Sequence, residues 1–466
     1  MKKYFRLIIL VLPFVLGTIG LLMKEVPLLD SAFYSVQMYV LNYGDSASNV
    51  WIELARWLAP LATASGIAMI ISSYSTKVKN YLCRLKGDSV AVYGNDEAAE
   101  VIKQLYGNRL ITVKENQFEK ADKYVLWNGD KENLTFDTKY RDKLKDHSVC
   151  MKCTSFSAQD LAGDKLTAVN PAMMSARMFW KEVDLYEYTK NHDFKVNISI
   201  IGFDELGQAL LLQGLQRNIF APDQQLTYHI FGDSTDFKHL YHQLDAMEDE
   251  INFYDNWRAH TDLLTNSIVI IAEQDDQYKL VHELLFGANP IQLHVLSEEA
   301  QCYELLENRE KIHLFEMNEH ILTEENLFEE ALLKKAKEIN LRYAHIYSKV
   351  EENLENREKE WKKLNSFTKG SNISAADYHE VRLNMMKSWG VSKDTLTVEQ
   401  LEFLAELEHI RWGRYHYLQN WKYGIPSNGK AKDVKERIHV DLKPYHQLSE
   451  EEKEKDRENI RVLLSI

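Results

Sequence analysis

Two long apolar runs without charged side chains lie in the first 76 residues of the chain. They cover residues 7–23 and 57–76, and each has about the length that a helix needs to cross roughly 30 Å of hydrocarbon. We therefore predict a transmembrane domain over residues 1–76, with spans over about residues 5–23 and 57–76. Basic residues precede the first run and follow the second. This pattern predicts a multi-pass protein of the inner (plasma) membrane with both termini in the cytoplasm.

The stretch between the two runs is charge-free over residues 31–44, rich in aromatic side chains, and too short to span a membrane. We interpret it as a re-entrant segment. It ends in Val40, Leu41, Asn42, Tyr43, Gly44 and Asp45. Here it resembles the pore helix and selectivity filter of two-helix potassium channels, whose filter reads Thr-Val-Gly-Tyr-Gly-Asp. Only the last three residues match, and Asn42 replaces a glycine that helps the filter carbonyls point inward.

The potassium-channel resemblance implies a pore-like domain in a homotetramer. The alternative is a pair of anchor helices joined by an amphipathic external loop. Both alternatives place the lipid membrane among the partners of this chain.

Two apolar strand patterns, residues 89–93 and 196–201, each run into a glycine and then into helical periodicity. Dinucleotide-binding folds need three small residues at this turn, so that the backbone can approach a pyrophosphate. In both repeats an aspartate stands at the middle position, where a carboxylate would repel a phosphate. Two hypotheses stay open: a site for NAD, ADP-ribose or another small nucleotide, or a scaffold kept for its shape. The candidate nucleotide-binding residues are Gly94, Gly202, Asp204, Gly207 and Asp233.

Branched apolar runs at residues 227–231, 267–272 and 291–296 are typical of buried parallel strands. The segment 201–209, with the spacing of these strands, resembles the Trk/RCK-type regulatory domains attached behind the last transmembrane helix of potassium channels and transporters. The resemblance implies an α/β fold with an α-helical membrane part and tandem Rossmann-like domains over residues 77–190 and 191–325. A charged helical pattern over residues 326–360 predicts a solvated linking helix.

Residues 361–466 are predicted to form a separate helical domain. Within it, the strings 405–412, 421–424, 443–445 and 454–457 resemble the RyR domain, a module first named in ryanodine receptors and also found in bacterial proteins. The resemblance implies a small-molecule pocket lined by Glu408, His409, Arg411, Trp412, Trp421 and Tyr423. The alternative is that both tryptophans belong to the core and that Glu408 and Arg411, three residues apart, hold the fold together.

Composition and charge exclude several classes of function for this chain. A formal net charge of -14 argues against a long nucleic-acid partner, because phosphate binding needs a basic face. Cys150 and Cys153 are separated by two residues, without a second pair at zinc spacing, so no metal site is expected. No nucleophile–base pair is evident, which predicts a protein that is not an enzyme.

We expect a ligand-gated, channel-like membrane protein that senses a nucleotide-type signal. The alternative is a membrane-anchored antiviral defence effector that disrupts the membrane without a selective pore.

Overall fold

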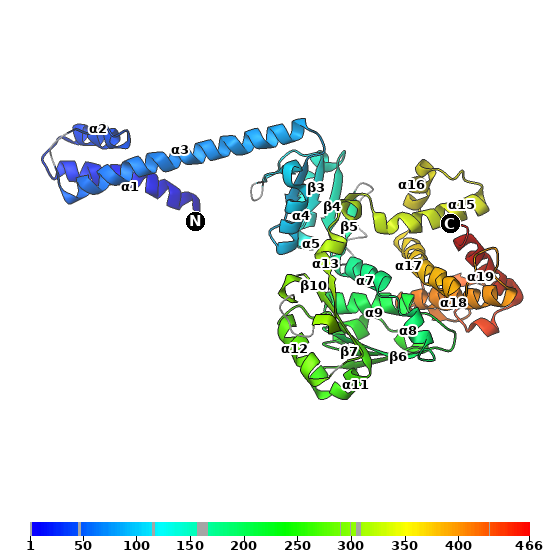
Figure 1. Ribbon diagram of the computed structural model, residues 1–466. Helices are drawn as coiled ribbons and strands as arrows, with labels where there is room; N and C mark the ends of the chain where they lie inside the picture. Colours follow the sequence, from blue (N-terminus) through cyan, green and yellow to red (C-terminus); the bar gives the residue numbers. More distant parts are fainter. Residues whose placement is uncertain are drawn as a thin grey trace. The chain divides into compact units, whose positions relative to one another are not determined.

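The computed structural model describes residues 2–44, 48–113, 117–155, 166–288, 290–298, 300–303, 309–427 and 429–466. The chain divides into two compact units (Figure 1). The first unit contains residues 1–91 and 107–122, and the second contains residues 92–106 and 123–466.

Three helices dominate the first unit: α1 (Lys2–Leu22), α2 (Leu28–Tyr39) and α3 (Val50–Leu85). Glycines let α1 approach the other two closely. A Cβ added at Gly17 would lie 2.8 Å from Ser35 Oγ, and one added at Gly20 would lie 2.8 Å from Ile52 Cγ1. Such contacts between small residues are common where helices pack in membranes.

Polar contacts also join these helices. The Asn49 side-chain amide donates to the Gly20 carbonyl at 2.7 Å, while its oxygen accepts from the Ile52 backbone N–H at 2.9 Å. Thr63 Oγ1 donates to the Tyr39 carbonyl at 3.0 Å. Because Asn49 caps α3, this helix begins at Val50 rather than near residue 57, and it continues without interruption to Leu85.

The outer surface of the three-helix bundle is apolar. Most of the exposed large hydrophobic side chains of the described chain lie between residues 11 and 85, and Leu29, Leu41 and Trp57 are at least 75% exposed. Within the described residues, no helix is both long enough and apolar enough to cross a membrane.

A five-stranded sheet has the order β2-β1-β3-β4-β5, and its pairs β1–β2, β3–β4 and β4–β5 are parallel. This is the 2-1-3-4-5 order of flavodoxin-like folds. Helices α4 (Glu97–Tyr106) and α5 (Asp130–Leu144) follow β1 and β3 in the chain. The strands are β1 (Val90–Tyr93), β2 (Leu110–Ile111), β3 (Lys123–Leu126), β4 (Ser148–Lys152) and β5 (Leu166–Val169).

A six-stranded, all-parallel sheet has the order β11-β10-β9-β6-β7-β8. Numbered from its first strand, this is the Rossmann order 3-2-1-4-5-6. The prediction of two Rossmann-like α/β sheets is confirmed, and the apolar runs predicted as strands lie in β7, β9 and β10. The strands are β6 (Lys195–Ile201), β7 (Gln225–Phe231), β8 (Glu250–Tyr254), β9 (Ser267–Ile271), β10 (Gln292–Ser297) and β11 (Ile312–Glu316).

Helices surround the second sheet and continue into the C-terminal region. Those between β5 and the linking segment are α7 (Pro171–Glu182), α8 (Tyr186–Lys190), α9 (Glu205–Arg217), α10 (Thr235–Leu240), α11 (Thr261–Thr265), α12 (Gln277–Gly287), α13 (Met317–Ile321) and α14 (Glu324–Phe328). The later ones are α15 (Lys334–Ser348), α16 (Leu354–Lys362), α17 (Ser366–Ser388), α18 (Val398–Leu418) and α19 (Glu450–Leu463).

The segment predicted as a single solvated linking helix, residues 326–360, differs in the structure. Helix α15 ends before Lys349, whose φ of 57° lies in the left-handed region, so α15 and α16 are separate helices. Ala336 and Ile339 of α15 are fully buried in a cluster that includes Ala375 of α17 and Leu463 of α19. This segment therefore belongs to the packed C-terminal helices.

The C-terminal helices, which were predicted to form a helical domain over residues 361–466, pack directly on the second Rossmann-like sheet. One core cluster combines Ile198 of β6 and Leu210 of α9 with Tyr378 of α17 and Leu404 of α18. Figure 1 shows α17 and α18 beside α9. The second Rossmann-like sheet and the C-terminal helices thus share a single hydrophobic core.

Candidate functional site

Helix α18 positions most of the residues that the C-terminal sequence motif singles out. It begins at a capping box, in which Gln400 N donates to Thr397 Oγ1 at 3.2 Å and Thr397 N donates to Gln400 Oε1 at 3.0 Å. The helix is buried on most of its circumference, so its polar side chains need partners inside the protein.

Glu408 is the centre of a buried charge triad on α17 and α18. Its carboxylate accepts from Arg411 Nη2 at 2.8 Å and Arg411 Nε at 3.0 Å, and it also pairs with Arg382. Arg411 Nη1 donates to Ser374 Oγ at 3.0 Å. All three charged side chains are at most 4% exposed. Arg411 therefore holds α18 to α17 and is closed to solvent.

His409 connects α18 to the chain that follows. Its Nδ1 lies 3.1 Å from Asp456 Oδ2 of α19, and its Nε2 lies 2.9 Å from the Lys443 carbonyl oxygen. Burial alone would lower the pKa of His409, but the hydrogen bond and charge of Asp456 outweigh it and leave this pKa raised. His409 thus joins α18 to α19 through a contact that favours its protonated form.

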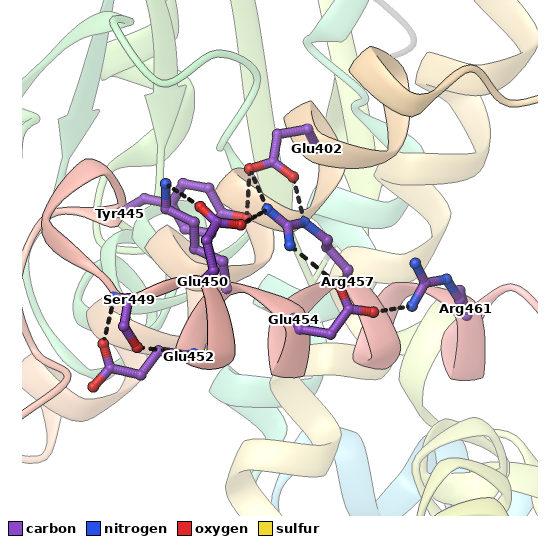
Figure 2. A network of polar contacts seen from close by, with 9 residues as sticks. Glu402, Tyr445, Ser449, Glu450, Glu452, Glu454, Arg457 and Arg461 are labelled. Atoms are coloured by element: carbon purple, nitrogen blue, oxygen red, sulfur yellow. Dashed lines mark hydrogen bonds and ion pairs between the residues drawn. The ribbon is translucent and has the colours of Figure 1, made fainter.

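A second polar network joins the same two helices (Figure 2). Arg457 of α19 forms a forked pair with Glu402 of α18, through Nε at 2.5 Å and Nη2 at 3.1 Å. Arg457 also contacts Glu450 and Glu454, and Tyr445 donates its hydroxyl to Glu402 at 3.1 Å. Forked arginine–carboxylate pairs fix orientation, so α19 is held in register on α18.

Residues 387–466 match the RyR domain family. They form a C-terminal RyR domain. No curated protein and no solved structure matches the chain. Within the RyR domain, His409, Asp456 and Arg457 of the sequence motif serve as the contacts between helices α18 and α19.

The structure separates the six residues predicted to line a RyR pocket. Four of them, Glu408, His409, Arg411 and Trp421, are buried, and the alternative of a fold-holding Glu408–Arg411 pair describes the geometry. Trp421 packs against Phe367 at 5.4 Å between ring centroids. The remaining two, Trp412 and Tyr423, reach the surface of the RyR domain, where Tyr423 is 56% exposed.

A small three-stranded sheet arranges polar and aromatic side chains beside Trp412. Its strands are β12 (Lys422–Tyr423), β13 (Lys432–Asp433) and β14 (Ile438–His439), in the order β12-β14-β13. Tyr423 is paired with His439, and His439 is paired with Lys432. Paired residues of neighbouring strands share a face, so these three side chains form one row, which we term the RyR row.

Trp412 contacts the RyR row through His439. Its ring meets the His439 ring edge-on, with 5.0 Å between centroids. His439 Nδ1 accepts a hydrogen bond from the Asp441 backbone N–H at 3.1 Å, which leaves the ring proton on Nε2 as a donor. Burial, together with the charges of Lys432 and Lys455, lowers the pKa of His439 to about 4. His439 is therefore a neutral donor between an aromatic ring and a cation.

The RyR row lies in a basic segment of a protein that is acidic overall. Residues 422–439 hold five basic and two acidic side chains, whereas the whole chain has a formal net charge of -14. The five cationic side chains are all exposed: Lys422, Lys430, Lys432, Lys435 and Arg437. Aromatic faces and cations in one place suit a ligand with a planar ring and an anionic group.

The second Rossmann-like sheet brings Gly202, Asp204, Gly207 and Asp233 to the carboxyl ends of β6 and β7. Asp204 Oδ1 accepts from the Leu206 and Gly207 backbone N–H groups at 3.1 and 3.4 Å. These amides at the start of α9 are the ones that a pyrophosphate would use. The Asp204 carboxylate already occupies them, so it caps the helix as an internal anion.

The turn after β6 is also tightly packed against neighbouring backbone. Gly202 has a φ of 90°, and a Cβ added there would collide with the backbone nitrogen of Glu273. Phe203 is buried and packs on Phe237 at 5.0 Å. Asp233 is exposed and accepts a hydrogen bond from the Thr235 backbone N–H at 2.9 Å. Hydrogen bonds from the side chain and backbone of Thr235 lower the pKa of Asp233.

The first sheet repeats this arrangement. Asp96 Oδ1 accepts from the Ala99 backbone N–H at 2.8 Å, and a Cβ added at Gly94 would lie 2.6 Å from the Trp127 carbonyl oxygen. Cys150 and Cys153 are fully buried, and burial raises the pKa of the Cys153 thiol to about 11. Within the described part of the chain, no group of three or more His, Cys, Asp or Glu side chains is placed to hold a metal ion.

The filter-like segment follows α2 in the first unit. Val40 and Leu41 are exposed, Leu41 has a φ of 58°, and Asn42 N donates to the Gln37 carbonyl at 3.1 Å, so the chain turns back on the helix end. The Tyr43 ring lies beneath the Arg56 guanidinium at 5.3 Å. An added Cβ at Gly44 would meet no atom within 4 Å. Asp45, the last residue of the predicted filter, lies outside the described residues.

Sequence reasoning missed His439 and Lys432 of the RyR row, as well as Arg382, Asp249 and Arg414. The row depends on pairing between two-residue strands, which leave no periodic pattern to detect. Arg382 and Asp249 lie 26 and 165 residues from their partners Glu408 and Arg414. The one available signal was Arg414 itself, a cation beside aromatic residues within the predicted helical domain.

Proposed function

We propose that this protein is a membrane-anchored, channel-like sensor that binds a small nucleotide-type ligand at the RyR row. The observation that carries the proposal is the placement of Tyr423, His439 and Lys432 in one row beside Trp412. By the channel resemblance, the working assembly is a homotetramer in the inner membrane.

The row matches the chemistry of a nucleotide. Tyr423 and Trp412 offer aromatic faces on which a base can stack. His439 Nε2 offers a neutral donor, and the exposed lysines around it offer charge to a phosphate. NAD, ADP-ribose, ATP and cyclic oligonucleotides all combine a planar base with phosphate groups, and they form the set to be tested.

For the Rossmann-like sheets we propose a role other than ligand binding. Asp204 and Asp96 occupy the helix amides that a bound pyrophosphate would require. We therefore assign the sheets the role of a scaffold that transmits ligand binding. Coupling requires the ligand to bind two arrangements of the protein with different affinity.

The three-helix bundle is the proposed membrane part. Its exposed apolar side chains match a lipid environment, and small residues pack its helices as in membrane proteins. Helix α3 is continuous for 36 residues, and only residues 86–89 separate its end from β1. A shift in the sheet therefore has a short covalent route to the membrane helices.

Ion flux through liposomes that contain the full chain tests this function. We expect potassium or sodium flux to increase when one of the four ligands is added, and Tyr423→Ala to abolish the increase. Phe286→Ala, which truncates a 91% exposed ring on α12, is the matched control and keeps the response. Ligand-triggered release of a large dye would favour the alternative, a defence effector that disrupts the membrane. No response to any of the ligands would contradict the proposal.

A further inference from the structure

The C-terminal turns of α3 have one face that is packed against the segment containing β2. Asn80 and Cys83 lie on this face and are at most 5% exposed. The Asn80 side-chain amide donates to the Thr112 carbonyl at 2.9 Å and accepts from the Thr112 backbone N–H at 2.9 Å. Cys83 Sγ donates to the Asn108 carbonyl at 2.9 Å. These contacts fix the rotation of α3 about its axis, so they also define the face that points away from this segment.

An apolar stripe runs along that opposite face. Successive residues of an α-helix are about 100° apart, which places four large apolar side chains within about 100° of one another and opposite the buried pair. All four are between 52% and 65% exposed. We term them the α3 stripe: Val78, Tyr81, Leu82 and Leu85. A contiguous row of exposed apolar side chains of this size indicates an interaction surface.

Basic side chains flank the α3 stripe on both sides. The same spacing puts Lys77 and Arg84 along one edge of the stripe, and Lys79 and Lys86 along the other. Residues 54–87 contain no acidic side chain, although the whole chain has a formal net charge of -14. The surface is therefore apolar along its centre and cationic along both edges.

This distribution of charge selects between two possible occupants of the surface. A second copy of α3, packed stripe against stripe, would bring cation against cation in either orientation, because both edges are basic. Like charges placed opposite each other weaken association. An anionic lipid surface matches the cationic edges, and its acyl chains match the stripe. Lys and Arg side chains can lie along such a stripe while their charged ends reach the phosphates.

We infer that the α3 stripe and its basic edges bind anionic phospholipids at the cytoplasmic side of the membrane. The inference rests on the membrane role proposed above and names a partner for it. Helix α3 has 36 residues and is therefore about 54 Å long, whereas a bilayer with its headgroups is about 40–45 Å thick. A helix of this length that crosses the hydrocarbon brings its last turns to the headgroup layer.

Lipid binding at this place would act on the first sheet. One face of α3 holds Thr112, which directly follows β2, and the opposite face would hold the lipid headgroups. Anionic lipid thus becomes a regulator, because it would favour the arrangement in which α3 lies against the membrane surface while it carries the edge of the sheet.

A polarity-sensitive dye on the α3 stripe tests the inference. The dye is attached to Leu85→Cys in the full chain, with Cys302→Ser to remove the exposed thiol. The labelled chain is reconstituted into vesicles of phosphatidylcholine, with or without phosphatidylglycerol. We expect the emission to shift to shorter wavelength only in the anionic vesicles. Free glycerol phosphate, added to the neutral vesicles, should cause no shift, because it has no acyl chains to surround the dye.

Two pairs of lysine substitutions test the basic edges. Each Lys near an anionic surface contributes about fivefold to binding, so Lys79→Gln with Lys86→Gln should remove most of the shift. Lys362→Gln with Lys363→Gln is the matched control, because it removes the same charge from the exposed end of α16. This control should keep the shift.

Flotation of the vesicles separates failure of this inference from failure of the membrane role. A chain that floats with the vesicles but shows no shift would overturn the inference alone. A shift of equal size in neutral and anionic vesicles would also overturn it, since a second copy would then cover the stripe. A shift that free glycerol phosphate reproduces, or that the Lys79→Gln, Lys86→Gln variant keeps, would likewise overturn it. A chain that floats with neither kind of vesicle contradicts the membrane role and the inference together.

Discussion

The Arg414 guanidinium of the RyR domain lies 2.6 Å from the Asp249 carboxylate, which directly precedes β8 of the second Rossmann-like sheet. Both side chains are at most 2% exposed. Arg414 Nη1 also donates to the Leu215 carbonyl of α9 at 3.0 Å. Helix α18 therefore contacts the sheet domain through a buried ion pair, while its neighbouring turns carry Trp412 and the contacts to α19. A ligand at the RyR row would act on a helix that is rigidly connected to the scaffold.

The ion pair predicts that Arg414→Met destabilises the protein strongly. Removal of one partner leaves the Asp249 charge buried and unmatched, which costs about 3 kcal/mol of unfolding free energy. Chemical denaturation measures this change. Adding Asp249→Asn to the same chain should recover more than about 1 kcal/mol, because the two substitutions act on one contact.

Arg461→Met is the control for the ion-pair experiment. Arg461 is 53% exposed, so its loss should change the unfolding free energy by less than about 0.5 kcal/mol. Because the two regions share one core, wild type should also unfold them in a single transition. An additive double variant would contradict the coupling between α18 and the second sheet.

The His409–Asp456 contact predicts a pH-dependent stability. The pKa of His409 is raised in the folded state, so folding favours its protonated form. This contribution is fully present below the unfolded pKa of about 6.5 and is lost as the pH rises through the folded pKa. Asp456→Asn should therefore cost about 2 kcal/mol near pH 6 and less near pH 9.

Denaturation of wild type and Asp456→Asn at both pH values measures this difference. Asp394→Asn, at an exposed position between α17 and α18, should show no such pH dependence. If the cost of Asp456→Asn were the same at pH 6 and pH 9, His409 would not be the cation that joins α18 to α19.

Two glycine substitutions separate a required turn from a tolerant one. Gly202→Ala forces a residue with a side chain into a φ of 90° and against the Glu273 backbone, so we expect a loss of about 2 kcal/mol or more. Gly287→Ala, at the end of α12, meets no atom within 4 Å and has no positive φ. Its unfolding midpoint should equal or exceed that of wild type. Equal effects at the two positions would contradict the close approach of β6 to the loop after β9.

Much of the fold could be predicted from the sequence, because it depends on local patterns. The branched apolar strands and the glycines at 94 and 202 predicted parallel sheets, and the structure has two of them. The error at residues 326–360 has a physical cause. Alternating Glu and Lys is typical of a solvated helix, yet Lys337 is buried because Glu330 and Glu358 pair with it at 2.5 and 2.6 Å. These partners lie 7 and 21 residues away, one of them beyond the break at Lys349.

The candidate site could be predicted only in part. The motif around Glu408 correctly identified a RyR domain, but motif residues can be retained for the fold as well as for a ligand. Spacing alone does not show that Arg411 points inward to Glu408 and Ser374 while Tyr423 points outward. That distinction depends on Arg382 and on the pairing of β12 with β14, which are contacts between segments far apart in the chain.

Isothermal titration calorimetry on the full chain in detergent, with NAD, ADP-ribose, ATP and cyclic oligonucleotides, tests the central claim most directly. The account predicts that at least one ligand binds, that Tyr423→Ala weakens it by about tenfold or more through the lost stacking, and that Asp204→Ala leaves it unchanged. The opposite pattern, with binding lost in Asp204→Ala and kept in Tyr423→Ala, would place the ligand on the Rossmann-like sheet and contradict the account. Absence of binding by all four ligands would contradict it as well.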